Sequence, residues 1–212
     1  MELYSLSNVN YEAILQYADE HDIKLFVFDL NGVLDDYYIK KVSFLQNVLM
    51  REHEHLLPEL WLAIERAYMM DHTATIKSST EQFLNAKGLF MTEAQRDMLA
   101  HDMFSSQLTN EAKAFLDSLT IPFVIYTSLS TEQADKALVG SDYNLFTRDD
   151  YKEMKPSIAN LEAIMTRYGA TPQETCVVGD GLVDDLMPAS LIGVHTILVS
   201  PYAQAFAHST KV

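Results

Sequence analysis

Residues 24–36, KLFVFDLNGVLDD, are the stretch of sequence that decides the fold. The compact apolar run at 24–30 includes the carboxylate of Asp29, and a turn with Gly32 follows it. An apolar run without alternation is typical of a strand that is buried on both faces, as in a parallel sheet. We therefore expect Asp29 at the carboxyl end of such a strand, where open α/β sheets bind their ligands.

Three further apolar runs repeat this pattern along the chain, at residues 121–128, 175–180 and 194–200. Between the runs lie helical patterns, at residues 8–20, 131–139 and 156–169. The expected helix-start signals are Asn8 or Ser7, Ser130 with Gln133, and Pro156 in a first turn. Strands that alternate with helices predict a parallel α/β sheet with right-handed crossovers.

Residues 38–108 break this alternation, because they carry apolar residues at helical spacing and no convincing buried strand. Ser78 with Glu81 and Thr92 with Gln95 are candidate capping boxes for two of these helices. We expect an all-helical domain at 38–108, inserted into a core formed by residues 1–37 and 109–212.

The composition narrows the class of protein further. The 212 residues include 30 Asp and Glu against 15 Lys and Arg, for a formal net charge of −15. This excess disfavours nucleic acid and anionic membranes as partners, since both are bound through basic side chains. The 48% of hydrophobic residues supply a core, and a lone cysteine, Cys176, suits a reducing compartment. Because the N-terminus does not resemble a signal peptide and no apolar run is long enough to span a membrane, we expect a cytoplasmic protein. We expect it to be a monomer or a homodimer.

Polar residues follow each strand-like segment, including a weaker one at 145–146. These residues are Asp29 to Asp36, Thr127 with Ser128, Lys155 with Pro156, and Gly179 to Asp185. The four motifs, in this order and around a helical insert, resemble the haloacid dehalogenase superfamily, most of whose members are magnesium-dependent phosphatases. The resemblance covers nearly the whole chain and implies a Rossmann-like three-layer core with a helical cap.

The resemblance also implies a role for each acidic motif residue. Asp29 would attack phosphorus and form an aspartyl-phosphate, which splits one difficult step into two. Mg²⁺ would be held by the Asp29 carboxylate, the Asn31 backbone carbonyl and Asp180, with Asp184 or Asp185 bonding to metal-bound water. The spacing in relatives favours Asp185. The expected activity is hydrolysis of a small phosphorylated metabolite.

The remaining motif residues would bind the phosphoryl group. By the same resemblance, Lys155 neutralises the phosphoryl oxygens and keeps Asp29 ionised. Thr127 and the backbone N–H of Ser128, expected at the start of the next helix, bind another phosphoryl oxygen. His72 and Lys77 lie in the least regular part of the insert, where caps of this family contact substrate, although a solvated loop explains them equally well.

Asn31 departs from the family pattern, because phosphatases of this family usually carry a second Asp at this position, as acid and base. An amide cannot cycle a proton, and such assistance is typically worth about 100- to 10,000-fold in rate. The alternatives are a slow phosphatase, a magnesium- and phosphate-binding protein without turnover, or an introduced substitution. Dehalogenases of the family also lack this Asp, but they do not need the Gly179-Asp180 pair.

Overall fold

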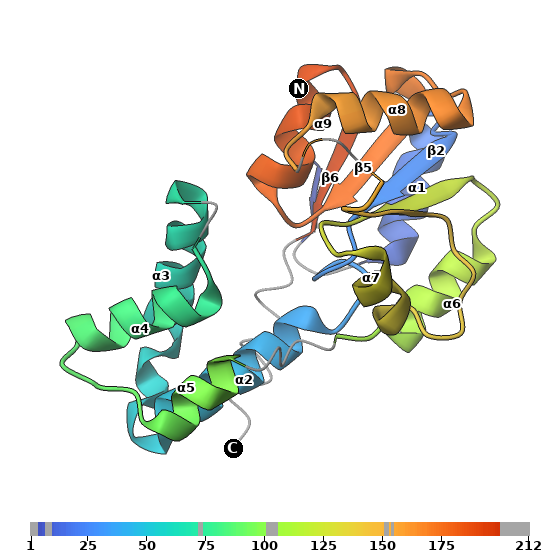
Figure 1. Cartoon of the computed structure of the whole chain (residues 1–212). Helices are drawn as coiled ribbons and strands as arrows, with labels where there is room; N and C mark the ends of the chain where they lie inside the picture. Colours follow the sequence, from blue (N-terminus) through green and yellow to red (C-terminus); the bar gives the residue numbers. More distant parts are fainter. Residues whose placement is uncertain are drawn as a thin grey trace. The chain divides into compact units, whose positions relative to one another are not determined.

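The computed structural model describes residues 4–6, 10–71, 74–100, 106–150, 153 and 155–199. It divides into two compact units, one of Met1–Tyr38 with Ser106–Val212 and one of Ile39–Ser105. The first unit contains a sheet flanked by helices, whereas the described part of the second contains helices alone (Figure 1). The second unit corresponds to the helical insert that the sequence predicts at residues 38–108.

The first unit is built on a six-stranded sheet in which the strand pairings are parallel. The strand order is β1-β6-β5-β2-β3-β4. The strands are β1 (Tyr4–Leu6), β2 (Leu25–Phe28), β3 (Phe123–Tyr126), β4 (Leu145–Phe146), β5 (Thr175–Gly179) and β6 (His195–Val199). The predicted Rossmann-like α/β class is confirmed, and β1 is a strand that the sequence analysis missed.

Both faces of the sheet are covered, as the continuous apolar runs predicted. The helices on the two faces are α1 (Tyr11–Glu20), α6 (Asn110–Ser118), α7 (Thr131–Ala137), α8 (Ile158–Tyr168) and α9 (Met187–Leu191) (Figure 1). Phe26 and Phe28 pack on one side, into the cluster that contains the apolar residues of α1, α6 and α7. Leu25 and Val27 pack on the other side, with residues of α8 and α9. Each fully buried side chain of this size contributes about 1.5–3 kcal/mol.

The helix starts correct two expectations in the first unit and bear out a third. Helix α1 is capped by Asn10, whose side chain accepts from the N–H of Ala13, whereas the predicted caps Asn8 and Ser7 lie outside the described residues. Pro156 lies before α8 rather than in its first turn, because Ser157 occupies the N-cap position. The capping box of Ser130 with Gln133 at the start of α7 is confirmed.

Four helices and a short 3₁₀ turn make up the described part of the second unit. They are α2 (Tyr37–His53, which begins in the first unit), η1 (Glu54–Leu56), α3 (Leu57–Met70), α4 (Ile76–Ala86) and α5 (Glu93–Ala100). The capping box of α4 pairs Thr75 with Ser78, so the expected pairing of Ser78 with Glu81 is wrong. Thr92 and Gln95 exchange the expected bonds before α5.

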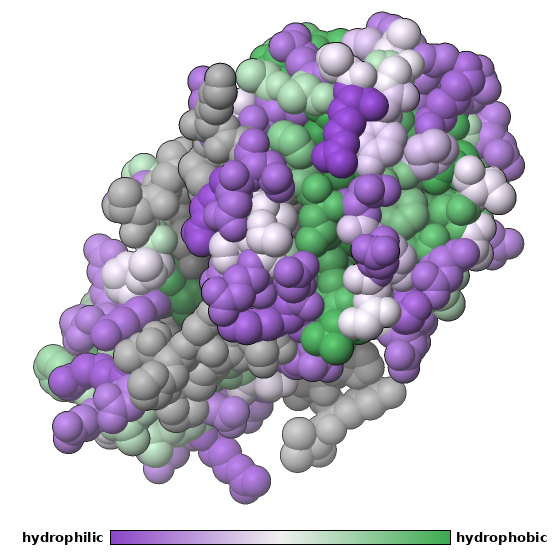
Figure 2. All heavy atoms as spheres, turned by 45° about the vertical axis from the view of Figure 1, so that its right-hand side comes forward, coloured by the Kyte–Doolittle hydropathy of each residue, from purple (hydrophilic) through white to green (hydrophobic). Residues whose placement is uncertain are grey.

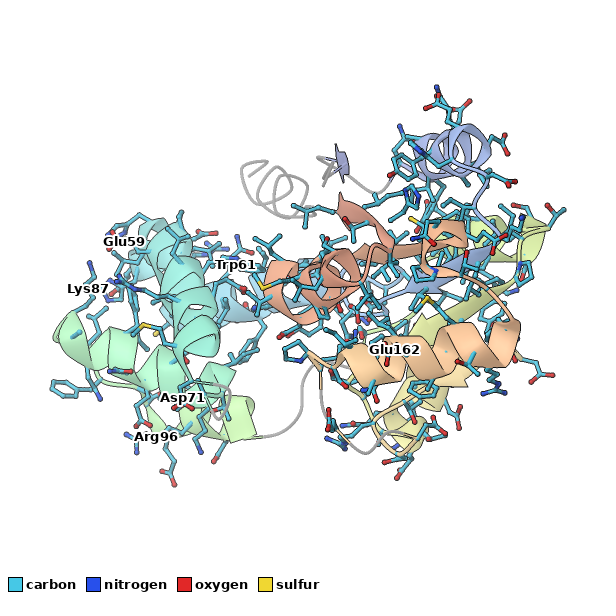
Figure 3. The ribbon with its side chains drawn as sticks, turned by 90° about the horizontal axis from the view of Figure 1, so that it is seen from above. Glu59, Trp61, Asp71, Lys87, Arg96 and Glu162 are labelled. Carbon is cyan, nitrogen blue, oxygen red and sulfur yellow. The ribbon has the colours of Figure 1, made fainter. Side chains whose placement is uncertain are left out.

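Ion pairs link the helices of the second unit, beside its buried apolar residues. Lys41 of α2 is buried, bonds to Glu65 of α3 at 2.7 Å and lies over the Trp61 ring. Lys87, just after α4, pairs with Glu59 of α3 at 2.6 Å, and Figure 3 shows these two residues close together. These contacts join three of its helices.

The described surface is largely hydrophilic on the face drawn in Figure 2, with apolar side chains between the polar ones. Among the described residues, no helix is both long enough and apolar enough to cross a membrane.

Candidate active site

Asp29 follows β2 directly, in the centre of the sheet. Its backbone N–H donates to the carbonyl of Val178 on the neighbouring strand β5, at 2.9 Å, which holds the residue at the end of the ladder. Its side chain is only 12% exposed and accepts a hydrogen bond from Nζ of Lys155 through Oδ1, at 2.7 Å. Asp29 therefore lies at the end of a strand, as predicted, and its side chain faces the buried ammonium group of Lys155.

Asp180 and Asp185 come from the end of β5 and the π-helical turn that follows it, η3 (Leu182–Leu186). Asp185 accepts from the N–H of Gly181 through Oδ2 and from Nζ of Lys155 through Oδ1. A Cβ on Gly179 would lie 2.6 Å from Cβ of Asp185, so this close approach requires glycine. Asp184, the other acid that the sequence left open, is exposed.

Lys155 joins the two acidic segments, because its Nζ lies 2.7 Å from both Asp29 and Asp185 and its side chain is 5% exposed. The ammonium group also lies 4.4 Å from the centre of the Tyr126 ring, at the end of β3. Asn160 of α8 donates to the Tyr126 hydroxyl and to the backbone carbonyl of Glu153. Asn160 thus connects the end of β3 to the loop that contains Lys155.

The charges in this cluster do not balance. Burial raises the pKa of Asp29 to about 7, with Lys155 opposing the shift and Asp185 adding to it. Burial and the charges of Asp29 and Asp185 raise the pKa of Asp180 well above its usual range. Burial lowers the pKa of Lys155, but Asp185 and Asp29 outweigh it and raise that pKa above the ordinary value. One ammonium group is too little positive charge for three carboxylates.

This donor set fits a hard divalent cation. Carboxylate oxygens of Asp29, Asp180 and Asp185 all lie within 4.8 Å of one another. Mg²⁺ takes oxygen ligands and is usually bound through one or two carboxylates, with water and phosphate completing its shell. A cation would also offset the cost of burying Asp29 and Asp180 as charged groups, which is the main cause of their raised pKa values.

The loop after Asp29 is organised by a second buried acid, Asp35. Its Oδ1 accepts from the N–H groups of Gly32 and Tyr37, and its Oδ2 accepts from the Asn31 amide at 2.8 Å. The Asn31 amide also donates to the hydroxyl of Ser106, at 3.3 Å. Burial raises the pKa of Asp35 to about 6. The side chain of Asn31 is thus held as a hydrogen-bond donor, by Asp35 of its own loop and by Ser106.

Tyr38 is a site residue that does not belong to any of the motifs singled out in the sequence. Its hydroxyl donates to Oδ2 of Asp180, a residue 142 positions away in the chain. The signal was weak, because an aromatic residue soon after a glycine turn predicts packing as readily as a polar contact. Its partner could be found only from the arrangement of the strands.

Thr127 follows β3 and is fully buried, with its hydroxyl accepting from the N–H of Leu129. Ser128 is exposed and lies two residues before Ser130, the N-cap of α7, so the expectation that it starts this helix is wrong. Lys77 is exposed on α4 of the second unit, and His72 lies outside the described residues.

Residues 23–193 match the haloacid dehalogenase-like hydrolase family, and no curated protein matches the chain in sequence. Solved structures share the fold. The magnesium-bound HAD-hydrolase YfnB of Bacillus subtilis is 14% identical with a TM-score of 0.61, covering 90% of this chain and 99% of its own. A predicted phosphoglycolate phosphatase of Haemophilus somnus 129pt is 17% identical with a TM-score of 0.53, and the match covers 86% of this chain and 91% of that one. L-2-haloacid dehalogenase of Xanthobacter autotrophicus is 19% identical with a TM-score of 0.58, and the match covers 90% of this chain and 84% of that one.

Proposed function

The chain belongs to the haloacid dehalogenase-like hydrolases, and on that premise we propose that it is a magnesium-dependent hydrolase of small phosphorylated metabolites. The observation that carries this proposal is the cluster of Asp29, Asp180 and Asp185 around Lys155. Three carboxylates with a single ammonium group suit a site that gathers a cation and a phosphate, because phosphoryl transfer depends on positioning and charge neutralisation.

In this proposal Asp29 is the nucleophile. Lys155 holds Oδ1 of Asp29, which leaves Oδ2 as the oxygen that attacks phosphorus. The bond from phosphorus to the leaving oxygen breaks, and the product is an aspartyl-phosphate on Asp29. Water then attacks this phosphorus, which releases inorganic phosphate and restores the Asp29 carboxylate.

The other residues bind the phosphate and the cation. Asp29, Asp180 and Asp185 would hold Mg²⁺, together with the backbone carbonyl of Asn31 that the family resemblance implies. Mg²⁺, when bound, would neutralise negative charge on the phosphoryl oxygens. Lys155 would contact the same oxygens from its position between Asp29 and Asp185, and Thr127 and Ser128, after β3, would contribute further donors.

The second unit is the part of the chain that we propose to select the substrate. It is inserted soon after the strand that carries Asp29. A folded helical cap disfavours phosphoproteins and suits small metabolites, and Lys77 and His72 are the proposed contact residues.

A specific observation favours a second candidate, a protein that binds magnesium and a phosphorylated ligand with little turnover. Asn31 stands where an acid would protonate the leaving group, and its amide donates hydrogen bonds to Asp35 and Ser106.

If the protein is a hydrolase, the leaving oxygen must take its proton from solvent, because Asn31 cannot supply one. Good leaving groups should be hydrolysed much faster than alkyl phosphates, because they need this proton least.

The test is a phosphatase screen with acetyl phosphate, an aryl phosphate and an alkyl phosphate, with and without Mg²⁺. We expect magnesium-dependent phosphate release from the first two substrates, loss of it in Asp29→Ala, and about a 100-fold or greater gain on the alkyl phosphate in Asn31→Asp. Intact mass is measured first, because deamidation at the Asn31-Gly32 step would convert Asn31 to an acid.

The other outcomes separate the candidates. If the wild type and Asn31→Asp are both inert while phosphate still binds, the binding protein is supported and the hydrolase is refuted. Magnesium-independent release of halide from a 2-haloacid would instead support a dehalogenase.

A further inference from the structure

Tyr38 makes a polar contact that the proposed mechanism does not use. The residue is 7% exposed, and its hydroxyl donates to Oδ2 of Asp180. A buried phenol on a carboxylate of the cluster differs from the other donors there, because it adds a hydrogen bond without adding charge.

The place of the Tyr38 ring is fixed by the loop that follows Asp29. Gly32 has a φ of +80°, and a Cβ at this position would overlap the ring of Tyr38. The neighbouring Tyr37 packs edge-on against the ring, with the centroids 5.4 Å apart. The backbone N–H groups of Gly32 and Tyr37 are in turn held by Asp35. The ring that carries the phenol is therefore packed against the Gly32 turn and Tyr37, in a loop whose backbone is hydrogen-bonded to Asp35.

We propose that Tyr38 is a positioning residue that aims the Asp180 carboxylate into the cation site, an inference that rests on the proposed function. A carboxylate has about four lone-pair positions, so it can accept the phenol hydrogen bond and bind a cation at once. Partners of this kind orient ligating groups, and losing one typically lowers metal affinity about 10- to 100-fold. Asp180 has particular need of such a partner, because Lys155 bonds to Asp29 and Asp185.

The experiment measures Mg²⁺ binding by calorimetry, and Mn²⁺ binding by electron paramagnetic resonance, in the wild type and three variants. Tyr38→Phe removes only the hydroxyl, Tyr37→Phe is the matched control on the adjacent ring, and Asp180→Asn removes the ligand. We expect affinity to fall about 10- to 100-fold in Tyr38→Phe, to stay unchanged in Tyr37→Phe and to be lost in Asp180→Asn. Urea unfolding of the metal-free variants identifies any general loss of structure.

A second readout does not depend on how well Tyr38→Phe folds. Adding Mg²⁺ to the wild type should change the ultraviolet absorption of a tyrosine, and Tyr37→Phe should retain this change. Wild-type affinity in Tyr38→Phe, or tighter binding because the phenol competes with the cation, overturns the positioning role and leaves the proposed function intact. If the wild type binds no cation, or Asp180→Asn binds as tightly as the wild type, both fail.

Discussion

Lys155 holds two buried carboxylates, and its removal is the sharpest test of the cluster at the level of one residue. In Lys155→Met, Asp29 and Asp185 would face each other without a cation, and breaking a buried ion pair in this way costs about 3–5 kcal/mol. Because Lys155 opposes the rise in the pKa of Asp29, its removal should raise that pKa above about 7. Part of the loss relative to the wild type should therefore be regained as pH falls from about 9 to about 7, where Asp29 of the variant takes up its proton before that of the wild type. Urea unfolding near pH 9 and near pH 7 measures both effects.

The control for this prediction is Lys24→Met, which breaks an ion pair with Glu174 in which the Lys24 side chain is 55% exposed. Exposed pairs of this kind contribute little to stability, because water and salt screen their charges. A similar loss of stability in both variants would show that Lys155 is an ordinary surface lysine and would contradict its place in the cluster.

The grouping of the site residues was predictable because the carboxyl ends of parallel strands meet at one edge of a sheet. Asp29 and Asp180 follow the paired strands β2 and β5, and so they meet. Between Asp184 and Asp185, the spacing in relatives favoured Asp185, and the π-helical turn η3 buries Asp185 and leaves Asp184 exposed. The hydrogen bond from Tyr38 to Asp180 depends on how the Tyr38 ring packs over Gly32, which cannot be predicted from the spacing of residues in the sequence.

At the level of single elements, runs of apolar residues predicted strands better than local signals predicted helix ends. The strands β2, β3, β5 and β6 lie within predicted runs, because a strand buried on both faces needs apolar residues at every position. Helix starts were less certain, since several Ser, Thr and Asn residues compete for one N-cap. At α1 and α4 the residues that cap the helix are Asn10 and Thr75.

Helix α7 allows its cap to be tested in isolation. The Ser130 hydroxyl accepts from the N–H of Gln133, and the Gln133 side chain accepts from the N–H of Ser130. Ser130→Ala should lower the free energy of unfolding by about 1 kcal/mol, because the first turn loses this acceptor. Ser128→Ala, at an exposed position before the cap, should change it by less than about 0.5 kcal/mol. Equal effects in urea unfolding would contradict the assigned cap.

At the level of the whole molecule, the acidic excess has both a general and a local component. A formal charge of −15 repels anions from the surface generally. At the site, the same excess is concentrated into three carboxylates that only a proton or a cation can neutralise further. A chain whose net charge we expect to disfavour nucleic acid can therefore still suit a small phosphate, as we propose, provided that a divalent cation reverses the local sign.

Protons and cations should therefore compete for the site, and pH should control how strongly Mg²⁺ stabilises the protein. Because the pKa of Asp29 is raised from 3.8 to about 7, the folded metal-free protein holds a proton that the unfolded chain has lost. Its stability should fall as pH rises between these values. Mg²⁺ binding displaces the proton, so the stabilisation by Mg²⁺ should grow from about pH 5 to about pH 8. Thermal unfolding with Mg²⁺ or with sodium chloride of equal ionic strength separates this effect from general screening of the net charge. In Asp180→Asn the difference between the two salts should vanish, and a pH-independent difference in the wild type would contradict competition at these carboxylates.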